Sequence, residues 1–470
     1  MRMVWPAVRK SRPPSPISKS HNLVNKWVRL RPICGILETK ELRRWIVQDL
    51  QNKGVTGVDK GRKPPILLEL CILLFYQLCQ AYCVRMQSWR WVLAVMLVAG
   101  SARAQWEILP SGSTADLRGV QAIGNGVAWA SGTEGTVLRT INDGKEWQRC
   151  ATPPDAEHVD FRGVQAFDAS TAIVMSSGKG ALSRLYKMTD GCKSWKLVFT
   201  NPDADGFFDT IVADRDQGFL IGDPVNGSFA IFSSIHTGLE VWNRFGKLAP
   251  PLYAGIYSGS FKRETLFAAS NSVLEGGPSS DIAFVTGGED SALFHEAAWN
   301  IRGPSGYPTT LAWTASLPLA KGASAGAFSL AGYGEQTLKH KRQYVVVGGD
   351  YMKPDSSTGT SAFSKDGGQH WFVPVTAPQG YRSAVAYDAG SKTWITVGSN
   401  GTDISTDDGR NWRALRPNAE LHEPADADQH WNALSLPFVV GPKGRIGKLR
   451  PDALKPGLPT SAPTLQGVSR

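Results

Sequence analysis

The chain has 470 residues, among them 49 glycines and 16 tryptophans, and a formal net charge of +10. The high glycine content and the scarcity of long apolar helical periods exclude a large helical domain and favour an all-β protein with many tight turns. The charge does not indicate nucleic-acid binding, because residues 1–104 hold 18 Lys and Arg against 5 Asp and Glu, whereas residues 105–470 hold 33 against 36.

A secretory signal peptide is predicted over residues 86–104. Met86 and a basic residue are followed by the apolar run 91–100 and then by the small residues Ala102 and Ala104, which is the three-part pattern of such a signal. The apolar run is too short to span a bilayer comfortably. We therefore expect cleavage before Gln105 and a periplasmic or secreted protein, with a retained anchor as the alternative.

Residues 1–85 precede that signal and contain a second apolar run, 66–84, interrupted by Glu69. Because a signal peptide normally begins at the N-terminus, we interpret residues 1–85 as a disordered leader that is not native to the protein and results from a start codon placed too far upstream. The alternative is a membrane segment at 66–84.

A repeat of about 45 residues follows. The segment 116–122 recurs 44 residues later as 160–166, with Arg-Gly-Val-Gln-Ala in common, and weaker copies begin at Phe208, Tyr253, Ser324, Tyr381 and Trp431. Strand-like runs that end in glycine follow each start, as consecutive hairpins require. Seven starts at this period predict a seven-bladed β-propeller over residues 105–449, followed by a disordered tail at 450–470.

Asp-box hairpins reinforce this prediction. The pattern Ser/Thr-x-Asp-x-Gly-x-x-Trp is complete at 364–371 and 405–412 and altered at 140–147 and 188–195. In such a box the carboxylate and hydroxyl bind turn N–H groups, and the tryptophan packs between blades. We therefore assign a structural role, and no catalytic role, to Asn142, Asp190, Asp366, Asp407, Trp147, Trp195, Trp371 and Trp412.

The last repeat contains only three strand-length pieces and no Asp-box, whereas 105–108 resembles the strand that follows a box. We therefore expect the N-terminal strand to complete the last blade and close the ring.

Only Cys150 and Cys192 remain after the expected cleavage. In an oxidising compartment they predict one disulfide, and two buried thiols are the alternative. No metal-ligand pattern and no nucleotide-binding glycine motif is present, so neither a metal nor another cofactor is expected.

The candidate binding site is formed by one position of the repeat, the residue that follows the aromatic residue at the beginning of each copy. In a propeller these residues begin the innermost strands and should form a ring at the mouth of the axial channel; they are Arg118, Arg162, Asp209, Ala254, Ala325, Arg382 and Asn432. We expect Arg118, Arg162 and Arg382, with Asp209, to bind carboxylate or phosphate groups of a partner. The alternative is structural pairing with Asp116, Asp160 or backbone carbonyls.

The chain resembles Asp-box proteins related to the photosystem II stability and assembly factor family over residues 105–449. The resemblance depends on the Arg-Gly-Val starts, on 189–195, on Gly222-Asp223-Pro224, and on the closing segments 431–434 and 441–444. It implies an exported, non-enzymatic binding or assembly scaffold with a basic contact patch formed by propeller arginines. The implied partner is a protein or an envelope component, and a glycan is also considered. Nucleic acid is not expected. The membrane is reached only through a partner or an uncleaved signal, and the protein is expected to be a monomer.

A glycoside hydrolase is the enzyme alternative, because Asp-boxes also occur in sialidases and related hydrolases. The nearest segment to the sialidase Phe/Tyr-Arg-Ile-Pro motif, 301–304, does not match it. A two-carboxylate hydrolase stays open, since its acid and base are distant in sequence. The candidate carboxylates are Asp209, Asp223, Glu289, Asp290 and Asp350.

Overall fold

The computed structural model describes residues 105–244, 264–276, 282–289, 292–297, 313–334, 341–419 and 422–454. The chain divides into two compact units, Met1–Ser101 and Ala102–Arg470, and every described residue belongs to the second. The predicted leader and signal peptide therefore lie outside the described residues. Within the described ranges no helix is long and apolar enough to cross a membrane.

Antiparallel sheets make up almost all of the secondary structure, with a 3-10 turn, η1 (Gly180–Leu182), between two strands. Five sheets have four strands each. The first contains β2 (Leu117–Gly124), β3 (Val127–Gly132), β4 (Val137–Thr140) and β5 (Gln148–Arg149). The second contains β6 (Phe161–Ala166), β7 (Ala172–Ser176), β8 (Arg184–Met188) and β9 (Lys196–Thr200). The third contains β10 (Phe208–Ala213), β11 (Gly218–Val225), β12 (Ser228–Ser234) and β13 (Asn243–Arg244).

The remaining two four-stranded sheets come from the C-terminal part of the chain. One contains β21 (Ala384–Asp388), β22 (Thr393–Gly398), β23 (Gly401–Ser405) and β24 (Arg413–Ala414). The other contains β25 (Ala433–Ser435), β26 (Phe438–Val440), β27 (Ile446–Leu449) and the N-terminal strand β1 (Trp106–Leu109).

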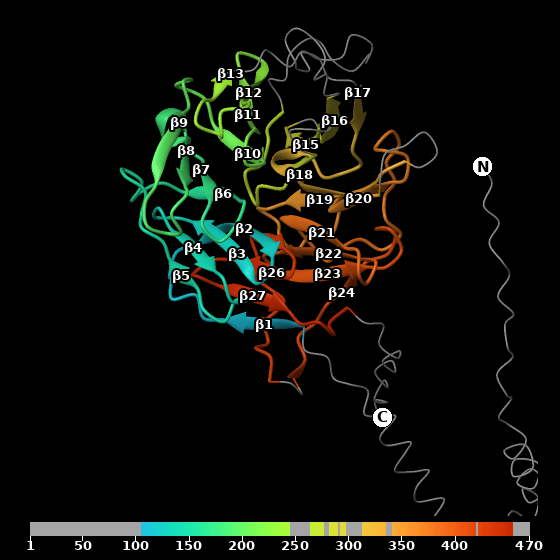
Figure 1. Ribbon diagram of the computed structural model, residues 1–470. Helices are drawn as coiled ribbons and strands as arrows, with labels where there is room; N and C mark the ends of the chain where they lie inside the picture. The colour runs from blue at the N-terminus through green and yellow to red at the C-terminus, as the bar shows by residue number, and fades with distance from the viewer. Residues whose placement is uncertain are drawn as a thin grey trace, which may run out of the picture. The chain divides into compact units, whose positions relative to one another are not determined.

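The sheets follow one another around a centre, and the chain is a β-propeller (Figure 1). The first strands of successive sheets are in contact: β2 with β6, β6 with β10, β21 with β25, and β25 with β2. Apolar side chains fill the space between neighbouring sheets, as Trp129 of β3 does against Phe161 of β6, both fully buried. This stacking buries the apolar face that no single four-stranded sheet could cover alone.

The sixth sheet has seven strands and does not separate into blades within the described ranges. Its strands are β14 (Leu274–Glu275), β15 (Ile282–Gly288), β16 (Leu293–Ala297), β17 (Trp313–Ser316), β18 (Gly322–Tyr333), β19 (Gln343–Asp350) and β20 (Ser361–Ser364). Pairing of Gly287 with Gly326 joins its two runs of strands, β15–β17 and β18–β20. The all-β propeller is thus confirmed, and the number of seven blades stays a prediction.

Closure by the N-terminal strand is confirmed. β1 pairs with β27 from Trp106 opposite Leu449 to Leu109 opposite Ile446. The Trp106 ring is buried, and its centroid is 6.0 Å from that of Trp431. The ordered structure also extends past the predicted end at 449, because Ala453 and Leu454 pack into the same apolar cluster.

Candidate binding site

A β-bulge places one polar residue at the start of each of the first three inner strands. In β2, Leu117 pairs with Gly132 and Gly119 with Ser131, so Arg118 is the extra residue. The pairings in β6 and β10 skip Arg162 and Asp209 in the same way. A bulge leaves its extra residue outside the regular ladder and turns the side chain away from it. The repeated sequence position is therefore a repeated structural position in these three sheets.

Arg118 and Arg162 meet at a single carboxylate. Arg162 Nε donates to Asp160 Oδ2 at 2.9 Å, and Arg118 Nε lies 3.7 Å from Asp160 Oδ1. The two arginine side chains are 33% and 31% exposed. Asp116, the other expected partner, instead accepts a hydrogen bond from the Lys443 N–H. Both the binding and the structural interpretations of the two arginines thus have support, because they pair with a carboxylate and still reach solvent.

The Arg118 guanidinium is the less satisfied of the two. Arg162 also donates to the Ala268 carbonyl at 3.4 Å. For Arg118, the 3.7 Å ion pair is accompanied by no hydrogen bond to any residue that the structure describes, and its Nε is buried without a hydrogen-bond partner. A guanidinium carries five N–H donors, and buried donors without partners are costly. Arg118 therefore has donors available for a ligand.

Asp209 lies beside this pair as a buried carboxyl group. It is 1% exposed, and neither of its oxygens has a hydrogen-bond partner among the described residues. Burial, reinforced by the charge of Asp223 and opposed by that of Arg162, raises the pKa of Asp209 well above its usual value. Burial likewise raises the pKa of Asp223, whose Oδ1 accepts hydrogen bonds from the Thr265 hydroxyl and the Leu266 N–H. The negative charge next to the arginine pair is thereby reduced.

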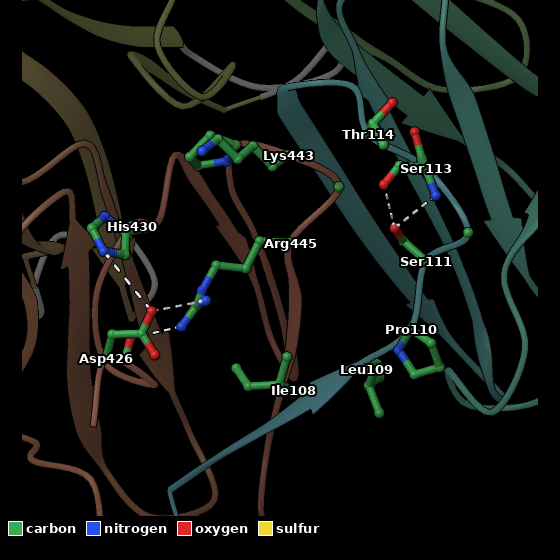
Figure 2. A pocket seen from close by; sticks show the side chains of 13 residues that line it. Ile108, Leu109, Pro110, Ser111, Ser113, Thr114, Asp426, His430, Lys443 and Arg445 are labelled. Atoms are coloured by element: carbon green, nitrogen blue, oxygen red, sulfur yellow. Dashed lines mark hydrogen bonds and ion pairs between the residues drawn. The ribbon is translucent and has the colours of Figure 1, made fainter. Parts of the chain in front are cut away.

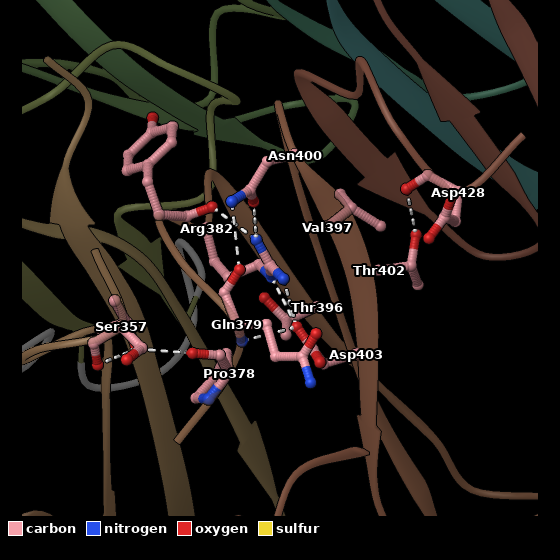
Figure 3. Close-up of polar contacts among 12 residues, drawn as sticks. Ser357, Pro378, Gln379, Arg382, Thr396, Val397, Asn400, Thr402, Asp403 and Asp428 are labelled. Carbon is pink, nitrogen blue, oxygen red and sulfur yellow. Dashed lines mark hydrogen bonds and ion pairs between the residues drawn. The ribbon is translucent and has the colours of Figure 1, made fainter. Parts of the chain in front are cut away.

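Arg382 does not belong to this ring, contrary to the sequence prediction. Its side chain is 1% exposed, its Nε donates to Asp403 Oδ2 at 2.9 Å, and its Nη1 donates to Asn400 Oδ1 at 2.6 Å (Figure 3). A third bond goes to the Tyr381 carbonyl at 2.8 Å. The donors are used inside the protein, so we assign Arg382 a structural role.

Strand register explains the difference. Ala384 pairs with Val397, immediately before Gly398, just as Gly119 pairs with Ser131 immediately before Gly132. Ser383 is therefore the counterpart of Arg118, and Arg382 occupies the buried position of Leu117.

The other ring positions change for the same reason. In β18 the pairing skips Phe328, which replaces Ala325 as the ring residue. Asn432 keeps its predicted place and donates to the Leu117 carbonyl at 2.8 Å. Ala254 lies outside the described residues. Tyr381 precedes β21, and burial raises the pKa of its hydroxyl, while the charge of Arg118 opposes that shift.

A cavity of about 650 Å³ lies next to the closing strand. Cationic and hydroxyl side chains occupy opposite sides of it (Figure 2). One side carries Lys443 and Arg445 with His430 and Asp426, and the other carries the hydroxyl side chains of Ser111, Ser113 and Thr114. Arg445 Nη1 lies 3.2 Å from Asp426 Oδ2. The Lys443 N–H binds Asp116, which lies two residues before Arg118 in the chain. Sequence reasoning missed this cavity, because its walls come from the N-terminal and the C-terminal segments of the propeller, which are far apart in the sequence.

The Asp-box residues hold hairpin turns. In the complete box at 405–412, the Ser405 hydroxyl donates to Asp407 Oδ1 and accepts the Gly409 N–H, and Asp407 Oδ1 also accepts the Asn411 N–H. Asn142 and Asp366 accept the equivalent N–H bonds in their boxes, and so does Asp190. The Ser194 hydroxyl, followed by its N–H, lowers the pKa of Asp190. The box tryptophans are buried or half-buried: Trp147, Trp195, Trp371 and Trp412.

Cys150 and Cys192 form a disulfide, with their Cα atoms 4.4 Å apart. Cys150 follows β5 of the first sheet, and Cys192 lies between β8 and β9 of the second. The bond therefore links two neighbouring blades. No group of three or more His, Cys, Asp or Glu side chains within the described ranges could hold a metal ion.

The remaining candidate carboxylates do not join Asp209 and Asp223. Glu289 is exposed, and Asp290 lies outside the described residues. Asp350 accepts a hydrogen bond from the Ser324 hydroxyl at 2.7 Å, which lowers its pKa. A buried pair that sequence reasoning missed is Glu264 with His295, whose Nε2 lies 2.8 Å from Glu264 Oε2. His295 lies in β16 and Glu264 in the segment before β14, and no motif marks them.

Solved structures of similar shape are propellers. A YCF48 structure bound to D1 peptide is 15% identical, with 74% of this chain and 97% of that chain covered and a TM-score of 0.47. YCF48 from Cyanidioschyzon merolae is 16% identical, with 74% and 100% covered and a TM-score of 0.49. The chain is a propeller similar in fold to these YCF48 structures. At such identities the similarity is one of fold alone.

A hydrolase is also among the similar structures. The GH74 xyloglucanase from Xanthomonas campestris is 13% identical, with 65% of this chain and 48% of that chain covered and a TM-score of 0.32. No protein-family model and no curated protein matches the chain.

Proposed function

We propose that the mature chain is an exported, non-enzymatic propeller, periplasmic or secreted, that binds a protein or envelope partner through Arg118 and Arg162. The observation that supports this proposal most strongly is the state of Arg118, which is one-third exposed and makes one 3.7 Å ion pair but no hydrogen bond to any described residue. Two guanidinium groups share the single carboxylate of Asp160. The cluster keeps an uncompensated positive charge.

A carboxylate of the partner is the group that suits this cluster. The planar guanidinium fork binds carboxylates through two parallel N–H···O bonds, which fix the direction as well as the charge of the ligand. Burial, which raises the pKa of Asp209, disfavours a competing negative charge at the same place. The cavity lined by Lys443 and Arg445 offers further basic side chains to the partner.

The test is partner capture from an envelope extract by the wild-type protein and by Arg118→Gln/Arg162→Gln. Each lost charged hydrogen bond contributes about 1.5–3 kcal/mol, so capture should weaken by about tenfold or more per arginine. Arg149→Gln/Arg413→Gln is the matched control, because Arg149 and Arg413 are exposed on the outer strands β5 and β24. Equal capture by the wild type and by Arg118→Gln/Arg162→Gln, with equal melting temperatures, would contradict the proposal.

A glycoside hydrolase is the second candidate, supported by the neighbouring carboxyl groups of Asp209 and Asp223. A raised pKa suits a general acid. Such an acid must reach the glycosidic oxygen, however, and Asp209 is only 1% exposed. The test is hydrolysis of a panel of β-glucans by the wild type and by Asp209→Asn. Activity that disappears in the variant would favour the hydrolase and displace the binding proposal.

A further inference from the structure

The backbone N–H of Gln105 donates a hydrogen bond to Glu423 Oε1. Gln105 is the first residue after the predicted signal peptide. The Glu423 side chain is only 2% exposed. Its other oxygen accepts the Asn418 N–H at 2.7 Å. A buried carboxylate is thus held by the first N–H group of the propeller and by one other amide.

The charge of this carboxylate is poorly compensated. The nearest cation among the described residues is Arg450, whose Nε lies 3.9 Å from Glu423 Oε1 and has no hydrogen-bond partner. Arg450 is also shared, because its Nη1 lies 3.8 Å from Glu107 Oε2. Buried charges are stable only when they are paired and hydrogen-bonded. Among the described residues no cation is in hydrogen-bond contact with Glu423, and the Gln105 nitrogen is in contact with its Oε1.

We propose that Gln105 is the N-terminal residue of the mature protein and that its α-ammonium group forms an ion pair with Glu423. The inference rests on the export proposed above. A signal peptidase would hydrolyse the bond between Ala104 and Gln105: water supplies the hydroxyl that leaves with the Ala104 carboxylate and a proton for the Gln105 nitrogen, which takes up a further proton from solvent at neutral pH. A neutral hydrogen bond thereby becomes a charge-assisted one.

The ion pair stabilises the strand that closes the ring. The Gln105 carbonyl accepts the Arg450 N–H at 2.9 Å, and the next residue, Trp106, pairs with Leu449. Glu423 belongs to the segment between β24 and β25, so the contact fastens β1 to the last two sheets. Processing of the N-terminus would strengthen closure.

The stabilisation should depend on pH. A free α-amino group has a pKa of about 7.7–8.0, and contact with Glu423 raises the folded-state value above that. The stabilisation is then complete below about pH 7.5 and is lost as the pH rises through the folded-state pKa. Among the described residues, Glu423 contacts the Gln105 nitrogen, Arg450 lies 3.9 Å from Glu423, and Glu107 lies 3.8 Å from Arg450.

The first experiment is export of the full chain in a bacterial secretion host, followed by mass spectrometry of the N-terminus. We expect Gln105 as the first residue. An uncleaved protein, or a mature chain that begins elsewhere, would overturn the assignment of the cleavage site.

The second experiment tests Glu423 without export. The residues just before Gln105 are replaced by a recognition sequence for a specific protease in the full chain, and the folded protein is melted before and after cutting. We expect cutting to raise the melting temperature by a few degrees in the wild type and in the control Glu157→Gln, an exposed site, but not in Glu423→Gln. Equal melting before and after cutting in the wild type would overturn the ion pair.

An N-terminal glutamine supplies an independent readout. A free α-amine can attack its own side-chain amide carbon and expel ammonia, whereas an ammonium group held by Glu423 cannot. Cyclisation, followed by mass spectrometry, should be faster in cut Glu423→Gln than in cut wild type. Equal rates would contradict the proposal. Loss of partner capture in Arg118→Gln/Arg162→Gln has no bearing on these results, so the two proposals fail separately.

Discussion

Arg382 and Asp403 form an ion pair from which solvent is almost completely excluded, with side chains 1% and 0% exposed. Removal of one partner leaves the other charge buried and uncompensated, so we expect Arg382→Leu to lower the free energy of unfolding by about 3–5 kcal/mol. Urea denaturation measures this change. Arg413→Leu, at an exposed position of β24, should change it by less than about 0.5 kcal/mol. A cost of Arg382→Leu as small as that of the control would show that the pair is not structural.

Asp209→Asn should stabilise the protein in a pH-dependent way. Burial raises the pKa of Asp209 in the folded state. The wild type therefore loses stability as the pH rises from the unfolded-state pKa of about 4 towards the folded-state pKa. Asparagine does not titrate. The advantage of the variant, measured as the difference between urea midpoints, should therefore be greater at pH 7 than at pH 4. A difference that is independent of pH would contradict the raised pKa.

An amide takes the place of the carboxylate in the Asp-box at 140–147, where the residue is Asn142. Asn142 accepts the Glu146 N–H at 3.0 Å, as Asp407 accepts the Asn411 N–H at 2.9 Å. We expect Asp407→Asn to cost less than about 0.5 kcal/mol and Asp407→Ala to cost about 1–3 kcal/mol, because alanine leaves turn donors unpaired. Chemical denaturation of both variants gives the comparison. Equal losses would mean that charge, not hydrogen-bond acceptance, is what the box needs.

The disulfide between Cys150 and Cys192 should contribute about 4 kcal/mol through loop closure, given its sequence separation of 42 residues. We expect a reductant to lower the melting temperature of the wild type but not that of Cys150→Ser/Cys192→Ser. The double variant should melt with the reduced wild type. If the wild type melted at the same temperature with and without reductant, the disulfide would not contribute to stability.

Local features were predictable from the sequence because each has its own chemistry. Each Asp-box contains its turn residues in a few consecutive positions, and each Arg-Gly-Val segment likewise contains its strand residues. The fold and the closing strand could therefore be predicted. The ring was predictable at Arg118 and Arg162, where the copies are nearly identical. The contact of Glu423 and the cavity at Lys443 could not be predicted, since both bring together residues from the two ends of the propeller's sequence.

The misplacement of Arg382 has a physical origin. The position equivalent to Leu117 and Phe161 is fully buried and normally apolar, so the aromatic Tyr381 was aligned with it. Arginine can occupy that position only because Asp403 in β23 accepts two of its N–H groups. A pairing between strands cannot be read from the pattern of one strand, and a shift of one residue changes which side chain faces the channel.

β1 cannot pair with β27 until the ribosome has made almost the whole propeller. Trp106–Leu109 is synthesised first among the described strands, and its partner Ile446–Leu449 is synthesised last. Until that partner emerges, the strand has exposed backbone donors and acceptors and an unburied tryptophan, which invite pairing with other chains. The nascent chain of this protein therefore carries an unpaired β1 during most of its synthesis.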